Sequence, residues 1–172
     1  GLRKLAQATP VWKPADSPTA TAFRDTYSHP REKVRFLGVW DTVGSLGIPG
    51  RLRGLTAGKY KFHDVELSSW VIGAYHALAV DEHRKPFEPA IWQTKPVEGQ
   101  EVEQAWFPGA HSDVGGGYQQ AGLSDQAFLW LVERAQRQGL AFNKAYLEGS
   151  VHADYAGKVH DSMDWYYRVL GN

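Results

Sequence analysis

VRFLGVWDTVGSLG, residues 34–47, places an acidic side chain directly after a nearly continuous apolar run. The run from Val34 to Trp40 is rich in the β-branched and aromatic residues that favour strands, and its apolar residues do not alternate with polar ones. Such a strand is buried on both faces, as in the middle of a parallel sheet. We therefore predict a strand over residues 33–40, with Asp41 at its carboxyl end and a glycine-rich loop beyond it.

A second stretch, EVEQAWFPGAHSDVGGGY at residues 101–118, has the same arrangement. It predicts a strand over residues 101–107, which a Pro-Gly pair ends shortly before His111. The run of glycines predicts an irregular loop after His111, because glycine lowers the steric barriers of the backbone and leaves its amides open to a substrate.

Two amphipathic patterns predict helices. One covers residues 65–80, with Asp64 as its N-cap, and the other covers residues 124–138, with Ser124 as its N-cap. Residues 90–93 are expected to form a third, short strand. Strands that alternate with helices indicate an α/β protein with a mostly parallel sheet flanked by helices.

The composition describes a folded chain without a general charge preference. The chain has 172 residues, 42% of them hydrophobic, enough for the core of one domain. Lys plus Arg and Asp plus Glu both number 19, so no general attraction to nucleic acid is expected. There is no cysteine, no apolar run near the roughly 20 residues of a membrane span, and no signal segment. We predict a soluble, single domain over residues 1–172, of which residues 1–32 form an irregular, proline-rich lead-in.

Asp41 and His111 are a candidate acid and base pair. A histidine acts as a general base near neutral pH when a carboxylate fixes its tautomer and stabilises the imidazolium. Acid before base is also the order that follows the nucleophile in α/β-hydrolases. The nucleophile itself is missing, because no G-x-S-x-G occurs, and Ser45 in VGSLG lacks that glycine spacing. Alternatively, the Asp41 side chain could cap a turn by accepting hydrogen bonds from backbone amides of that turn.

Two further side chains belong to the helix predicted over residues 65–80. His76 lies beside its apolar stripe, where it is either a buried structural histidine or a site residue. Asp81 is expected at the solvated end of this helix, where its carboxylate could bond a neighbouring loop.

A divalent metal bound by Asp41, His111 and Asp113 is an alternative, since carboxylates and imidazoles are common metal ligands. No HxH or HExxH cluster supports it. We expect no metal and no cofactor.

Three segments in this order resemble the DUF2235 family of α/β-hydrolases, which includes the Tle1 group of phospholipase effectors of bacterial type VI secretion. They are FLGVWDTVGSLG, YHALAVDEHRKPFEP, and EQAWFPGAHSDVGGGY with the following LSDQAFLWLVERA. In that family a G-F-S-R-G-A nucleophile elbow stands upstream of the tryptophan and aspartate motif. The resemblance therefore implies that this chain is the C-terminal portion of a larger α/β-hydrolase catalytic domain and begins just after the elbow.

The resemblance also implies site residues and a function. Asp41 becomes the triad acid and His111 the triad base of a serine ester hydrolase, phospholipase-like or lipase-like. The nucleophilic serine is then expected on an upstream segment or a second chain. The supporting loop and the further candidates are Asp113, Gly115, Gly116, Gly117, His76 and Asp81.

Partners and compartment follow only from the resemblance. It implies an ester or phospholipid substrate and an immunity or secretion partner. It leaves the compartment open between the cytoplasm and secretion as an effector without a signal peptide. The alternative is a degenerate, non-catalytic hydrolase fold that binds a partner or serves assembly.

Overall fold

The computed structural model describes residues 17–29, 32–43, 67–93 and 95–163. The chain divides into two units, Gly1–Lys33 and Val34–Asn172, and each is described by itself. The expectation of a single domain over the whole chain stays a prediction. In the part of the chain that the structure describes, no helix is both long and apolar enough to cross a membrane.

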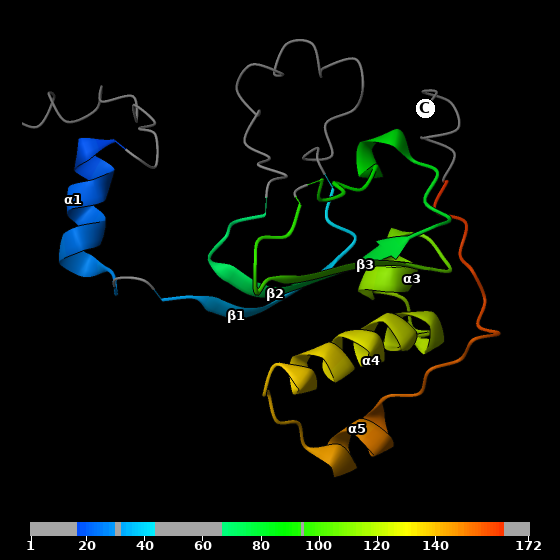
Figure 1. Ribbon diagram of the computed structural model, residues 1–172. Coiled ribbons are helices and arrows are strands. Elements are labelled where there is room, and N and C mark those ends of the chain that lie inside the picture. Colours follow the sequence, from blue (N-terminus) through cyan, green and yellow to red (C-terminus); the bar gives the residue numbers. More distant parts are fainter. Residues whose placement is uncertain (1–16, 30–31, 44–66, 94, 164–172) are drawn as a thin grey trace, which may run out of the picture. The chain divides into compact units, whose positions relative to one another are not determined.

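The first unit contains the helix α1, Pro18–Tyr27 (Figure 1). Ser17 begins it, because its side chain accepts a hydrogen bond from the Ala20 amide at 3.4 Å, and Pro18 takes a first-turn position that needs no amide hydrogen. The prediction of an irregular lead-in over residues 1–32 is therefore wrong for α1. The Ser-Pro pair was the signal for a helix start.

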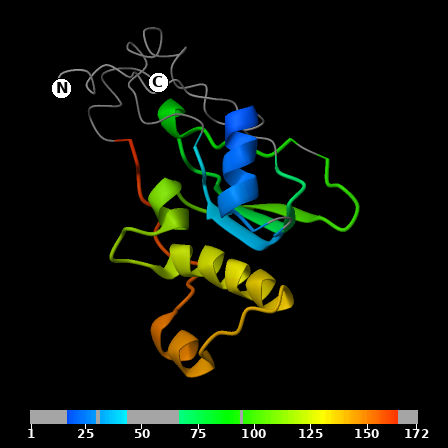
Figure 2. The same cartoon turned by 90° about the vertical axis from the view of Figure 1, so that its left-hand side faces the viewer.

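The second unit is built on a parallel sheet of three strands in the order β1-β2-β3. The strands are β1, Val34–Trp40, β2, Val71–Ala79, and β3, Glu101–Phe107. Because all three run in the same direction, their carboxyl ends meet at one edge of the sheet (Figures 1 and 2). The predicted α/β class and the strands at both ends of this order are confirmed.

The central strand β2 lies where a helix was predicted over residues 65–80. Its sequence VIGAYHALA is almost completely buried, because it pairs with a strand on each side and its side chains are covered on both faces of the sheet. A strand buried in this way has no polar face, so its sequence does not alternate between apolar and polar residues. The spacing of its apolar residues then also fits the apolar stripe of a helix. The expected cap Asp64 lies outside the described residues. β1, expected in the middle of a sheet, is an edge strand among the three described strands.

The strand predicted over residues 90–93 does not form. In its place an isolated bridge joins Val43 to Pro89. The side chain of Gln104 on β3 pairs with the backbone of Trp92, accepting from its N–H at 2.9 Å and donating to its carbonyl at 3.0 Å. The Gln104 side chain thus makes hydrogen bonds to Trp92 of the kind that a neighbouring strand would make through its backbone.

Two helices, α3 and α4, pack against the sheet. The helix α4, Gly122–Arg137, confirms the prediction over residues 124–138, although it starts earlier than Ser124, whose Oγ donates to the Ala121 carbonyl at 2.9 Å. The short helices are α3, His111–Gly115, α5, Lys144–Ser150, and the 3-10 turn η2, Lys85–Phe87. The segment expected to be an irregular loop after His111 is therefore helical for one turn before Gly116.

The core beneath the carboxyl edge joins β2 to α3 and α4. Ala77, Ala79, Val114 and Ala127 are buried against one another, with Phe107 and Trp130 packed on them. Small side chains on β2 allow the helices to come close to the sheet. This packing supports α3, the helix that begins with His111.

Candidate active site

Asp41 is completely buried at the carboxyl end of β1. Its N–H donates to the Ala77 carbonyl at 2.7 Å, and its Oδ1 accepts from the Ala79 N–H at 2.8 Å. Its φ is +37°, a left-handed conformation that aspartate tolerates better than most residues. The central strand thus fixes both the backbone and one carboxylate oxygen of Asp41.

His111 meets the other oxygen of that carboxylate. Its Nδ1 lies 2.7 Å from the Asp41 Oδ2, and the imidazole side chain is 31% exposed while the Asp41 side chain is 0% exposed. Because the carboxylate can only accept, Nδ1 carries the hydrogen, and in the neutral form of the ring the free lone pair is then on Nε2. Within the described residues Nε2 takes part in no hydrogen bond. This is the arrangement that a general base requires.

The ring of His111 also has an apolar neighbour. The Phe87 ring lies 5.2 Å from it at an interplanar angle of 63°, an edge-to-face contact. The Arg84 guanidinium stacks on the same phenyl ring at 3.7 Å. The Phe87 contact limits the orientation of the imidazole, and Arg84 packs on the other partner of that contact.

His76 lies on β2, and not on a helix as predicted. It is fully buried, and its Nε2 accepts from the Thr42 N–H at 3.1 Å and lies 2.9 Å from the Thr42 Oγ1. Burial lowers the pKa of His76 and outweighs the opposing charge of Asp41, so the ring is neutral. Its Nδ1 has no hydrogen-bond partner in the described part of the chain. His76 therefore holds the residue that follows Asp41.

Asp81 follows the central strand and does not end a helix in solvent. Its Oδ2 accepts from the Gly109 N–H at 2.7 Å, and its own N–H donates to the Gly109 carbonyl at 3.1 Å. This reciprocal pair fixes the turn that leads from β3 to His111. The bond to a neighbouring loop that the sequence allowed for is thus present.

Glu82 is a residue of the site that the sequence did not single out. Its side chain is 1% exposed, and its Oε2 accepts from the His111 N–H at 3.2 Å. Burial alone raises the pKa of Glu82, but hydrogen bonds from Arg84 and His111 and the Arg84 charge outweigh it and lower the pKa to about 2. Its place three residues after the end of β2 was the signal for it, and that signal was concealed when β2 was predicted to be a helix.

Asp113 supports the backbone before His111. It is 2% exposed, and its Oδ2 accepts from the Ala110 N–H at 3.0 Å, while Oδ1 lies 2.6 Å from Nδ1 of His160. Of the expected glycine loop, Gly115 belongs to α3, and only the next two residues have positive φ, 87° and 128°. Among the described residues, no cluster of histidines and carboxylates is arranged to hold a metal ion. Of the three ligands of the metal alternative, Asp41 and His111 meet each other, whereas Asp113 binds the Ala110 N–H and His160.

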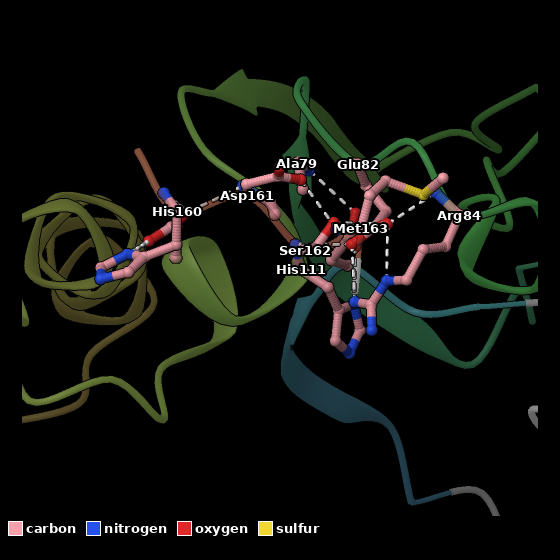
Figure 3. Close-up of polar contacts among 11 residues, drawn as sticks. Ala79, Glu82, Arg84, His111, His160, Asp161, Ser162 and Met163 are labelled. Atoms are coloured by element: carbon pink, nitrogen blue, oxygen red, sulfur yellow. Dashed lines mark hydrogen bonds and ion pairs between the residues drawn. The ribbon is translucent and has the colours of Figure 1, made fainter. Parts of the chain in front are cut away.

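The segment HALAVDE, residues 76–82, forms hydrogen bonds both with the turn that contains Asp41 and with the turn that leads to His111. Through His76 and the Ala79 N–H it holds the turn after β1, and through Asp81 and Glu82 it holds the turn after β3. One segment on the central strand therefore sets the separation of the acid and the histidine. Figure 3 shows Ala79, Glu82 and His111 gathered at this point.

A comparison with protein families identifies the family of this chain. A family model described as "T6SS, Phospholipase effector Tle1-like, catalytic domain" matches residues 4–134. The chain belongs to this family. The matched range contains all three strands and α3, and with them Asp41 and His111. The resemblance drawn from the three sequence motifs is confirmed.

One similar protein is a yeast protein without a stated function. The uncharacterized protein YEL023C of Saccharomyces cerevisiae (strain ATCC 204508 / S288c) is 28% identical over 130 residues, which cover 67% of this chain and 18% of that protein. The chain thus corresponds to less than a fifth of that relative. No solved structure gives a significant match.

Proposed function

We propose that this chain supplies the acid and the base of a serine ester hydrolase that acts on lipid esters. The observation that carries the proposal is the 2.7 Å contact between His111 Nδ1 and the buried Asp41 carboxylate. The family description, a phospholipase effector catalytic domain, supports a lipid ester as the substrate class. The chain is then the C-terminal portion of a catalytic domain, and Ser45, which lacks the G-x-S-x-G spacing of a nucleophile, lies outside the described residues.

The chemistry follows from the two ring nitrogens. The serine Oγ, supplied by an upstream segment or a second chain, attacks the ester carbonyl and gives its proton to His111 Nε2. Asp41 stabilises the resulting imidazolium through Nδ1–H. His111 then protonates the departing alcohol, and an acyl-enzyme remains. Water hydrolyses this intermediate with His111 again as the base, which restores the serine and releases the fatty acid.

The test requires a preparation that contains both this chain and the serine-bearing segment. Hydrolysis of a short-chain ester and of phospholipid vesicles is measured for the parent and for His111→Ala. We expect turnover to fall by about three to four orders of magnitude in His111→Ala. The control His152→Ala removes an exposed histidine of the same chain and is expected to retain the parent rate.

Unchanged turnover in His111→Ala would exclude His111 as the base. A parent preparation that hydrolyses neither ester, although it is folded and contains the serine, favours the alternative of a non-catalytic hydrolase fold that binds a partner.

A further inference from the structure

The segment from His160 to Ser162 lies beyond the family-matched residues 4–134, yet it reaches the turn that carries His111. It has no regular secondary structure and follows α5 in the chain. Figure 3 shows Ser162 beside Glu82 and His111, whereas His160 stands apart from this group. The segment therefore approaches the turn at two separate points.

The first point is Asp113. Its Oδ2 accepts from the Ala110 N–H and from the His160 N–H, each at 3.0 Å, and its Oδ1 lies 2.6 Å from His160 Nδ1. The His160 ring also stacks on Tyr118, with centroids 3.8 Å apart. A carboxylate that is 2% exposed thus links the residue before His111 to a residue 47 positions beyond Asp113.

The second point is Glu82. Its Oε2 accepts from the His111 N–H at 3.2 Å, and its Oε1 accepts from the Ser162 Oγ at 3.1 Å. This carboxylate also accepts from the Arg84 backbone N–H at 2.8 Å and from two guanidinium nitrogens of Arg84 at 2.9 and 2.8 Å. Glu82 thus joins the backbone of His111 to a residue 80 positions beyond itself.

The two links hold consecutive amides. The N–H groups of Ala110 and His111 each donate to a buried carboxylate. Each of these carboxylates also accepts a hydrogen bond from the segment of residues 160–162. The five-residue helix α3 is too short to be stable without tertiary contacts. The orientation of its first residue therefore depends on these contacts.

We propose that His160 and Ser162 are positioning residues that hold His111 against Asp41. They do not touch the reacting atoms, and they act through Asp113 and Glu82. The proposal rests on the proposed role of His111 as the base, but its test measures the pairing of His111 with Asp41 and not turnover. A failure of one proposal is thus distinguishable from a failure of the other.

The experiment follows the Nδ1 proton of His111 by NMR in the full chain, where its resonance is identified by its loss in His111→Gln. His160→Phe retains a ring for stacking on Tyr118 and removes the Nδ1 donor to Asp113, while the backbone N–H donor remains. His160→Asn keeps a donor near the position of Nδ1. Ser162→Ala removes only the hydroxyl donor to Glu82. His152→Phe is the matched control, because His152 is an exposed histidine of the same C-terminal region.

We expect the exchange of this proton with solvent to be about tenfold faster in His160→Phe and in Ser162→Ala, near the parent rate in His160→Asn, and unchanged in His152→Phe. Parent-like exchange in a folded His160→Phe overturns the role of His160. If His160→Phe does not fold, Ser162→Ala decides, and parent-like exchange there overturns the proposal. A parent chain without a slowly exchanging Nδ1 proton also overturns it, because His111 is then not held at Asp41.

Discussion

Asp41 and His111 are 70 positions apart in the chain, yet their side chains meet at 2.7 Å. The parallel sheet brings them together, since each follows the carboxyl end of a strand that flanks β2. The central strand then fixes each partner through its own hydrogen bonds, Ala79 N–H to Asp41 and Glu82 to the His111 N–H. The pair therefore depends on β2 as much as on the two residues themselves.

The first prediction concerns the acid. Asp41→Asn retains an oxygen that can accept from the Ala79 N–H, so the turn is kept, but the amide places a donor or a neutral oxygen against His111. In the serine-containing preparation we expect the ester turnover number to fall about ten-thousandfold while the fold is retained. Ester hydrolysis and circular dichroism measure the two effects. Parent-like turnover in a folded Asp41→Asn excludes Asp41 as the acid.

The second prediction concerns the pH dependence of stability. The pKa of Glu82 falls from its ordinary value of 4.5 to about 2 in the folded chain, so the folded state binds this proton more weakly than the unfolded state. The stabilisation is therefore present above about pH 4.5 and is lost as the pH falls toward 2. Glu82→Gln is expected to lower the free energy of unfolding by up to about 3 kcal/mol at pH 7 and by much less near pH 3.

Denaturant unfolding at both pH values measures this difference. Glu133→Gln is the control, because Glu133 is 66% exposed and its ion pair with Arg134 is expected to contribute less than about 1 kcal/mol at either pH. If Glu82→Gln and the parent lose stability equally between pH 7 and pH 3, the low pKa of Glu82 is wrong.

The third prediction concerns the turn before His111. Asp81→Ala leaves the Gly109 N–H without its carboxylate acceptor, whereas Asp81→Asn keeps an oxygen in the same place. We expect Asp81→Ala to lower the free energy of unfolding by about 1–3 kcal/mol and Asp81→Asn to lower it by about 1 kcal/mol or less. Hydrogen exchange of the Gly109 amide locates the effect. Equal protection of this amide in both variants contradicts the role given to Asp81.

Part of this arrangement could be predicted from the sequence. The strand before Asp41 and the strand before His111 were predicted because each has strand-forming residues that end at a glycine or proline signal. The helix α4 was predicted from its apolar stripe. With two strands and their carboxyl ends known, parallel topology places Asp41 and His111 at the same edge of the sheet.

The rest depends on tertiary contacts that local patterns do not contain. β2 has no alternation because both of its faces are buried, so its alanines indicated a helix. That error hid the hydrogen bond between Glu82 and the His111 N–H. The links from His160 and Ser162 span 47 and 80 positions, and no motif in the sequence marks them.

The last prediction compares two glycines with positive φ. Gly109 has a φ of +107°, and a Cβ there would lie 2.3 Å from the Cβ of Asp113, whereas Gly99 has a φ of +78° and nothing within 4 Å of such a Cβ. Gly99→Ala therefore adds backbone strain alone, about 1–2 kcal/mol. Gly109→Ala adds a clash with the buried Asp113 side chain, which is expected to lower the free energy of unfolding by about 1–3 kcal/mol more.

The clash also has a local consequence. Asp113 holds the Ala110 N–H, so its displacement by Gly109→Ala is expected to move α3 and to weaken the contact between His111 and Asp41. Denaturant midpoints of the two variants give the difference in stability, and the exchange of the His111 Nδ1 proton gives the local effect. Equal losses of stability in the two variants, or an unchanged exchange rate of the His111 Nδ1 proton in Gly109→Ala, would contradict this prediction. The turn at Gly109 would then accommodate the Cβ without changing the contact between His111 and Asp41.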